Sequence, residues 1–243
     1  MRRRKGTLKL YVAGRVSLWE SMPDWTTTFS QFSPGPTRLI GSVVVRVADW
    51  SRPRAGRALV SDSVWLDRLT CAHPGFVLAV YAPAGICLVR RAQGLGIAPI
   101  ALCYVAGLFA WTLLEYVVHR ASFHHVPTSP GQVAYGYLVH GVHHAYPDDS
   151  RRWVLPLVAT VPIAIVLFCI FTLALGRVAA PAFAGFMHGY LTYDLLHYVI
   201  HRGRVPTRLG RYLRQYHLAH HYATPDRHFG VSSPLWDILF RTR

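Results

Sequence analysis

Ten of the chain's fourteen histidines fall into four short groups with fixed spacing, a pattern typical of metal ligands. On a helix that advances about 100° per residue, the spacing of HGVHH and of HLAHH places three imidazoles on one face, and HYVIH places two. A helix that carries both His119 and His124 must end or unwind between them if both are to reach one metal ion. The ten are His119, His124, His140, His143, His144, His197, His201, His217, His220 and His221.

The number of imidazoles indicates which metals fit. A lone histidine near a membrane helix is more often a buried polar group with a hydrogen-bond partner. Ten together without a metal would repel one another when protonated and leave unsatisfied nitrogens when neutral. Ligation by imidazole alone is compatible with iron, zinc and copper. Ten ligands suit two ions, whereas a closed zinc site needs about four per ion. The excess favours two iron ions with an open position for dioxygen, and zinc is an alternative occupant in isolated protein.

Three carboxylates lie close in sequence to these histidines. Metal-bound imidazoles commonly donate their second N–H to a carboxylate or a carbonyl. Glu115 lies one turn before His119, Asp194 lies three residues before His197, and Asp148 follows HGVHH. We expect these carboxylates to accept hydrogen bonds from ligand imidazoles, with an ion pair to a nearby arginine as the alternative for each. His73, His125, His188 and His228 have no partner at such spacing and are expected outside the metal site.

The elements that must position the histidines are apolar. Of the 243 residues, 52% are hydrophobic, and the mean hydropathy is +0.24, too high for an ordinary soluble domain. Four apolar stretches, near 75–89, 96–118, 154–175 and 178–200, approach or reach the roughly 20 residues of a spanning helix. They pair into two hairpins through the short turns RRAQGL and GR. Two histidine groups precede the second hairpin and two end or follow it, so all ten can meet at one membrane face.

The distribution of basic residues gives the expected orientation. The net charge is +15, and of 26 lysines and arginines only Arg90, Arg91 and Arg177 fall in the two turns. The other 23 lie on the histidine side, which places that side in the cytoplasm. The sequence thus predicts an all-α integral membrane fold with four transmembrane helices in two hairpins and a cytoplasmic histidine-rich helical cap. Residues 1–70 are expected to form a basic, loosely structured N-terminal arm, and residues 71–243 the membrane domain. With no recognition helix or RNA-binding motif, nucleic acid is not an expected partner.

Four segments together resemble a known family. EYVVHRASFHH, HGVHHAYPDDSRR, GYLTYDLLHYVIHR and YHLAHHYATPDRHFGVSSPLWDILF are similar, in order and spacing, to the signature blocks of the fatty acid hydroxylase or sterol desaturase superfamily, most closely to its fatty acid 2-hydroxylase branch. The resemblance covers roughly residues 100–243. Two departures are Arg202, where many relatives have a second histidine, and RRWVLP, where RLVxPP is commoner.

The resemblance implies a cytoplasmic di-iron site held by the same ten histidines. It also implies a monooxygenase that hydroxylates a lipid acyl chain at the carbon next to the carbonyl, with dioxygen as co-substrate and two electrons. Some relatives carry an N-terminal haem domain, but CAHPG at residues 71–75 runs straight into an apolar stretch and is not expected to bind haem. We therefore expect a separate electron donor such as a ferredoxin or a small cytochrome.

Two other functions remain compatible with the same histidines. Sterol or carotenoid hydroxylation or desaturation in the same superfamily would use a metal site of the same appearance. A non-catalytic membrane metal-binding protein is the alternative of a different class. Transporters usually hold their ligands near the middle of the membrane on broken helices, whereas these histidines lie at the ends of the apolar stretches and beyond them.

Overall fold

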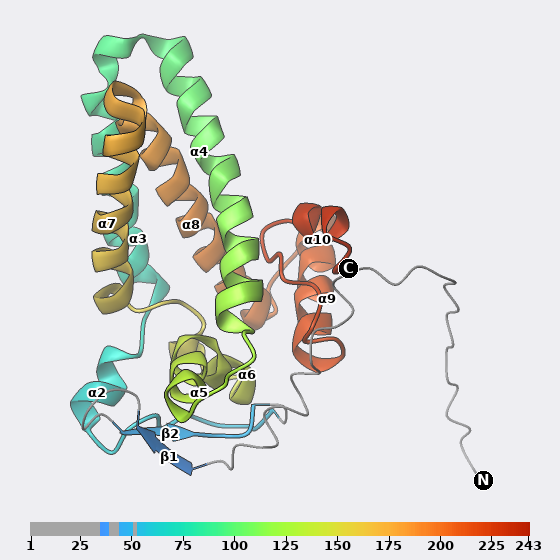
Figure 1. Cartoon of the computed structure of the whole chain (residues 1–243). Helices are drawn as coiled ribbons and strands as arrows, with labels where there is room; N and C mark the ends of the chain where they lie inside the picture. The colour runs from blue at the N-terminus through green and yellow to red at the C-terminus, as the bar shows by residue number, and fades with distance from the viewer. Residues whose placement is uncertain (1–34, 39–43, 51–52) are drawn as a thin grey trace.

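The computed structural model describes residues 35–38, 44–50 and 53–243 (Figure 1). Its secondary structure is mainly helical. The described elements are β1 (Gly35–Arg38), β2 (Val44–Val47), α2 (Val64–Leu69), α3 (Pro74–Arg91), α4 (Ile97–Val118), α5 (Pro130–Gly136), α6 (Val142–Ala145), α7 (Leu157–Leu175), α8 (Ala179–Arg202), α9 (Arg208–Tyr222) and α10 (Leu235–Leu239).

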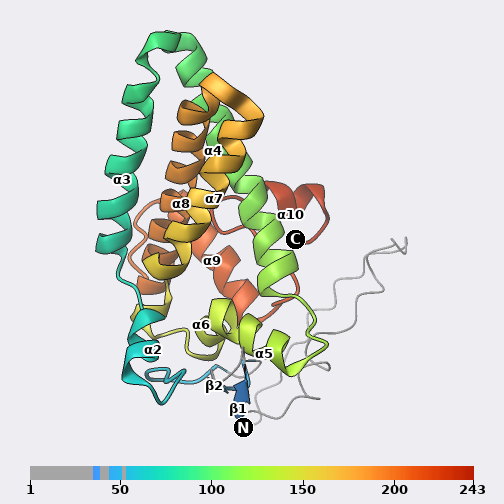
Figure 2. The same ribbon diagram turned by 60° about the vertical axis from the view of Figure 1, so that its left-hand side comes forward.

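The four predicted apolar stretches are the four long helices. α3 and α4 form one hairpin and α7 and α8 the other, with both turns at the same end of the bundle (Figures 1 and 2). By length and composition, two segments are apolar enough to cross a membrane, Ile97–Phe123 and Ser150–Arg202, and the second contains the α7–α8 hairpin. Many large apolar side chains of α4 and α7 are exposed, including Leu102, Ile163 and Leu173. A lipid environment would cover such surfaces.

Helix α8 is the centre of the bundle, because α3, α4 and α7 all pack against it. α4 approaches α8 closely at two glycines. A Cβ atom at Gly107 would overlap the carbonyl oxygen of Ala182, and one at Gly185 would overlap that of Tyr104. Only glycine allows the two backbones to approach this far. The close contact fixes where the histidines at the lower ends of both helices can lie.

Short helices below and beside the bundle carry the remaining histidines. Their starts follow from capping: the Ser129 hydroxyl accepts a hydrogen bond from the Gln132 amide at α5, and the Thr207 hydroxyl accepts one from the Gly210 amide at α9. Gly203, with φ of 78°, ends α8 in the left-handed conformation. α10 is attached to α4 by a 3.0 Å hydrogen bond from the Trp236 indole to the Thr112 hydroxyl.

The described part of the predicted N-terminal arm is folded, which differs from the loose structure expected for residues 1–70. Strands β1 and β2 form an antiparallel pair that contacts α5, so the fold is not purely helical. Val45, Ala58 and Val60 are buried in one apolar cluster with residues of α5 and α6. The β-branched residues of VVRV explain strand β2. The expected arm overlooked the apolar surface of α5 and α6, which this segment covers. Residues 1–34, 39–43 and 51–52 of the predicted arm lie outside the described part.

Candidate metal centre

The end of α4 brings His119 and His124 together. α4 continues into a π-helical turn over His119–Phe123, in which the amide of His124 donates to the carbonyl of His119 at 3.1 Å. This i→i+5 bond widens the turn, so that two residues five apart point the same way. The sequence predicted that the helix must end or unwind here, and the π-turn is how it does so.

The two histidine triplets each contribute to two different groups. In HGVHH, which spans a second π-turn (Tyr137–Gly141) and α6, His140 and His144 join one group and His143 the other. In HLAHH on α9, His220 joins the first group and His217 and His221 join the second. The i, i+4 pairs stay together, but the spacing had predicted all three histidines of each triplet on one face. The middle histidine of each triplet, His143 or His220, belongs to the neighbouring group.

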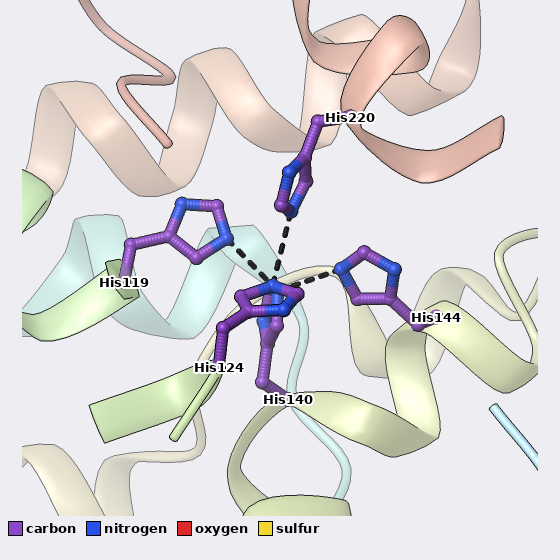
Figure 3. Close-up of side chains that lie close together, drawn as sticks. All are labelled: His119, His124, His140, His144 and His220. Carbon is purple, nitrogen blue, oxygen red and sulfur yellow. Dashed lines mark hydrogen bonds between the residues drawn. The ribbon is translucent and has the colours of Figure 1, made fainter. Parts of the chain in front are cut away.

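All ten predicted histidines therefore gather in two groups of five. The first group is His119, His124, His140, His144 and His220, and the second is His143, His197, His201, His217 and His221. Within each group the candidate ligand atoms lie within 4.8 Å of one another. Figure 3 shows the first group, with its imidazoles directed at a common centre from the end of α4, the π-turn before α6, α6 itself and α9.

The contacts between ring nitrogens fit a bound cation better than hydrogen bonds. The Nε2 atom of His217 lies 3.0 Å from the Nε2 atoms of three other histidines of its group. One imidazole nitrogen offers either one N–H or one lone pair, so it cannot form three hydrogen bonds at once. Both ring nitrogens of His143 are also buried without a hydrogen-bond partner among the described residues. A metal ion at the centre of each group would satisfy these lone pairs.

Backbone carbonyls fix the orientation of three imidazoles. The Nδ1–H groups of His119, His197 and His220 donate to the carbonyls of Phe229, Trp153 and Arg227 at 2.5, 2.6 and 2.6 Å. A carbonyl only accepts, so Nδ1 carries the proton and Nε2 keeps a lone pair directed into the group. None of these carbonyls was predicted, because a backbone acceptor has no residue-type signature in the sequence.

Burial keeps the histidines outside the apolar helices in the neutral form that binds metal. Desolvation, reinforced by neighbouring imidazoles, lowers their pKa well below the ordinary value of 6.5. Neutral imidazole is the form that ligates a metal. The histidines with this shift are His124, His140, His143, His144, His217, His220 and His221.

The three carboxylates expected beside the imidazoles occupy other positions. Glu115 accepts hydrogen bonds from the amides of Val231 and Ser232, at 2.6 and 2.8 Å. It thereby holds the loop whose Phe229 carbonyl accepts from His119. Asp194 accepts a 2.5 Å hydrogen bond from the Tyr190 hydroxyl. Asp148 is exposed. Closeness in sequence predicted contact between carboxylates and imidazoles, but backbone carbonyls accept from the imidazoles instead.

A buried ion-pair network supports the segment after HGVHH. Asp149 accepts from the Ala58 amide at 2.9 Å and pairs with Arg151 at 2.7 Å, and Arg152 pairs with Asp67 at 2.7 Å. The adjacent acidic and basic residues of PDDSRR were the sequence pattern that could have indicated these ion pairs. The structure places the other four histidines, His73, His125, His188 and His228, outside both groups with partners of their own.

A small pocket adjoins both groups. His140 of the first group and His143 and His197 of the second line it, together with the predicted site residue Asp194. Apolar side chains of Phe123, Leu138, Val139, Val142, Val154 and Leu155 contribute to its wall, beside the polar Thr70 and Arg152. A pocket with apolar walls and a few polar groups is the usual form of a small-molecule site.

Comparison with known proteins identifies relatives of this arrangement. The dihydroceramide fatty acyl 2-hydroxylase FAH2 of Arabidopsis thaliana is 37% identical over 63% of this chain and 65% of its own length. Human fatty acid 2-hydroxylase is 36% identical over 57% of this chain but only 38% of its own length. The chain therefore matches less than two thirds of either relative.

A solved structure and a family model agree with these relatives. The structure of scs7p, in which only the hydroxylase domain is visible, is 32% identical and superposes with a TM-score of 0.74 over 79% of this chain and 75% of that one. The model for the fatty acid hydroxylase family matches residues 104–242, which contain all ten histidines. This confirms the resemblance of the four histidine segments, and the chain belongs to the fatty acid hydroxylase family.

Proposed function

We propose that this chain is a membrane di-iron monooxygenase that hydroxylates carbon 2 of a lipid acyl chain. The observation that carries the proposal is the pair of adjoining five-histidine groups with one pocket lined by residues of both. A site that only stored metal would have no need for such a pocket. The hydroxylase relatives support the acyl substrate.

Each histidine group would hold one iron ion. Iron supplies the redox chemistry by which dioxygen attacks an unactivated C–H bond. The chain's own residues keep the imidazoles neutral by burial and orient them through the carbonyls of Phe229, Trp153 and Arg227. Five ligands per group exceed the roughly four of closed zinc sites, which favours iron as the working metal and leaves zinc as an occupant of isolated protein.

The substrate we favour is the acyl chain of a ceramide-type lipid. Relatives are named for hydroxylating dihydroceramide fatty acyl groups, and yeast SCS7 is named a ceramide very long chain fatty acid hydroxylase. The apolar side chains of the pocket suit the carbons beside an acyl carbonyl. A sterol or carotenoid would need room for a rigid ring system at the same place.

We further propose that α3, α4, α7 and α8 all cross the membrane and that the histidine groups lie on the cytoplasmic side. The exposed apolar surfaces of α4 and α7 support insertion. The concentration of arginines at the histidine end supports the orientation. The electrons would come from a separate ferredoxin or small cytochrome that meets this basic face.

The test is expression in a ceramide-producing host that lacks its own acyl 2-hydroxylase, followed by mass spectrometry of its lipids. We expect new 2-hydroxyacyl ceramides from the unchanged chain and none from His124→Ala. His125→Ala is the matched control, because this neighbouring ring lies outside both groups and should retain activity. Unchanged acyl chains alongside a hydroxylated sterol or carotenoid would reject the proposed substrate.

A further inference from the structure

The pocket beside the histidine groups contains one buried cation. Arg152 lines the pocket, and its side chain is 1% exposed. Charged residues of this kind are almost never fully buried unless they are paired. The partners of each guanidinium nitrogen therefore show what the residue is for.

The Nε nitrogen of Arg152 has no hydrogen-bond partner among the described residues. One terminal nitrogen pairs with Asp67 at 2.7 Å, and the other donates to the Thr70 carbonyl at 2.9 Å and to the Thr70 hydroxyl. Leaving a buried donor of a charged group unsatisfied is costly. An oxygen atom of a ligand in the pocket would remove that cost.

The proposed reaction requires an oxygen atom at this place. The carbon to be hydroxylated is bonded directly to the acyl carbonyl carbon, so the carbonyl oxygen must also lie close to the two histidine groups. His140, His143 and Arg152 line the same pocket. A site that hydrogen-bonds a polar substrate group can select strongly against analogues that lack it.

On the basis of the proposed acyl hydroxylation, we propose that the Nε–H of Arg152 donates to the carbonyl oxygen of the acyl group and so presents carbon 2 to the metal centre. Arg152 is then the residue that determines which carbon is hydroxylated. The shared chemistry of the ligand is an acyl carbonyl. An N-acyl amide and a free carboxylate both offer one, and the experiment compares the two.

The first measurement is the position of the hydroxyl group. Arg152→Lys keeps a positive charge near Asp67 but lacks Nε–H. We expect about 10- to 100-fold less 2-hydroxyacyl product and a larger share of product hydroxylated at other carbons. Asp67→Asn is the control: it alters the same ion pair, leaves the pocket donor and should preserve the position. An unchanged product position in Arg152→Lys, or the same shift in both variants, would overturn the assignment.

The second measurement needs no turnover. Two photoreactive probes carry a diazirine on acyl carbon 3, one a dihydroceramide and the other a free fatty acid. The probe that is recognised should label peptides containing Leu138 or Val154, with about tenfold less labelling in Arg152→Lys. Labelling that is independent of Arg152 for both probes would reject the inference. Dependence on Arg152 without any hydroxylated product would instead reject the proposed function and keep the pocket assignment.

A second variant covers the case in which Arg152→Lys does not fold. Leu138→Trp places a larger side chain in the pocket from an apolar position of its wall. It removes no hydrogen-bond partner of Arg152. We expect it to block photolabelling while bound iron is retained. Undiminished labelling of the same peptides in Leu138→Trp would show that the probe does not use this pocket.

Discussion

The imidazole rings of His144 and His221 stack face to face, with centroids 4.1 Å apart and an interplanar angle of 19°. His144 belongs to the first histidine group and His221 to the second. The two groups are thus parts of one buried cluster, built where α6 meets α9. Residues that orient one group are therefore positioned to affect both.

Glu115 should act on metal binding through a loop. It holds the Val231 and Ser232 amides, and the same loop presents the Phe229 carbonyl to His119. Loss of such support typically weakens metal affinity about 10- to 100-fold. We expect this for Glu115→Ala in a chelator competition, with a smaller effect for Glu115→Gln, whose carbonyl oxygen still accepts. Equal affinity in Glu115→Ala and the unchanged chain would contradict this role.

The close contact of α4 and α8 should make Gly107 intolerant of any side chain. A Cβ atom there overlaps the Ala182 carbonyl, so Gly107→Ala must push the helices apart, at a cost of about 1–3 kcal/mol. Thermal unfolding in detergent should show a lower midpoint. Gly94→Ala is the control, because nothing lies within 4 Å of its added Cβ. If both variants unfold at the same temperature, the packing argument is wrong.

The sequence predicted the long helices and the ten clustered histidines because both depend on local patterns. Apolar stretches define the helices, and spacing defines the histidine faces. Two ions with about five ligands each were expected, but which histidines form each group was not predictable, since it depends on the π-turn at Tyr137–Gly141 and on how α9 meets α6.

The features that the sequence missed are long-range contacts. Glu115 pairs with amides more than a hundred positions away, and the carbonyls of Phe229 and Trp153 carry no residue-type signal. The strands near the N-terminus pack against an apolar surface of α5 and α6, and that surface exists only in the folded chain.

The rate at which an acidic electron donor reduces the metal centre should depend on the arginines near the end of α8 and the start of α9. Arg204 and Arg208 are exposed. Replacing both by glutamate should slow reduction of the metal centre about tenfold at low salt and weaken its salt dependence. Stopped-flow reduction with a ferredoxin would measure this. Arg90→Glu with Arg91→Glu, at the other end of the bundle, should leave the rate unchanged; equal slowing by both pairs would contradict local docking.

The proposed four-span topology predicts which chain positions share a side of the membrane. Reporter enzymes inserted at Gly94 and at Arg177 should be active on the non-cytoplasmic side, because both lie in turns at the same end of the bundle. A reporter fused after Arg243 should be active in the cytoplasm. If the Gly94 and Arg243 reporters are active on the same side, the first hairpin does not span as proposed.

The most direct test of the central claim is isotope labelling with ¹⁸O₂. Purified, iron-loaded protein is supplied with a dihydroceramide, a chemical source of electrons and ¹⁸O₂, and the product is analysed by mass spectrometry. The proposed oxygenase predicts a 2-hydroxyacyl product whose hydroxyl carries the heavy isotope, in amounts that vanish in His124→Ala and persist in His125→Ala. A hydroxyl that carries oxygen from water, or the same yield from both variants, would contradict a di-iron monooxygenase built on these ten histidines.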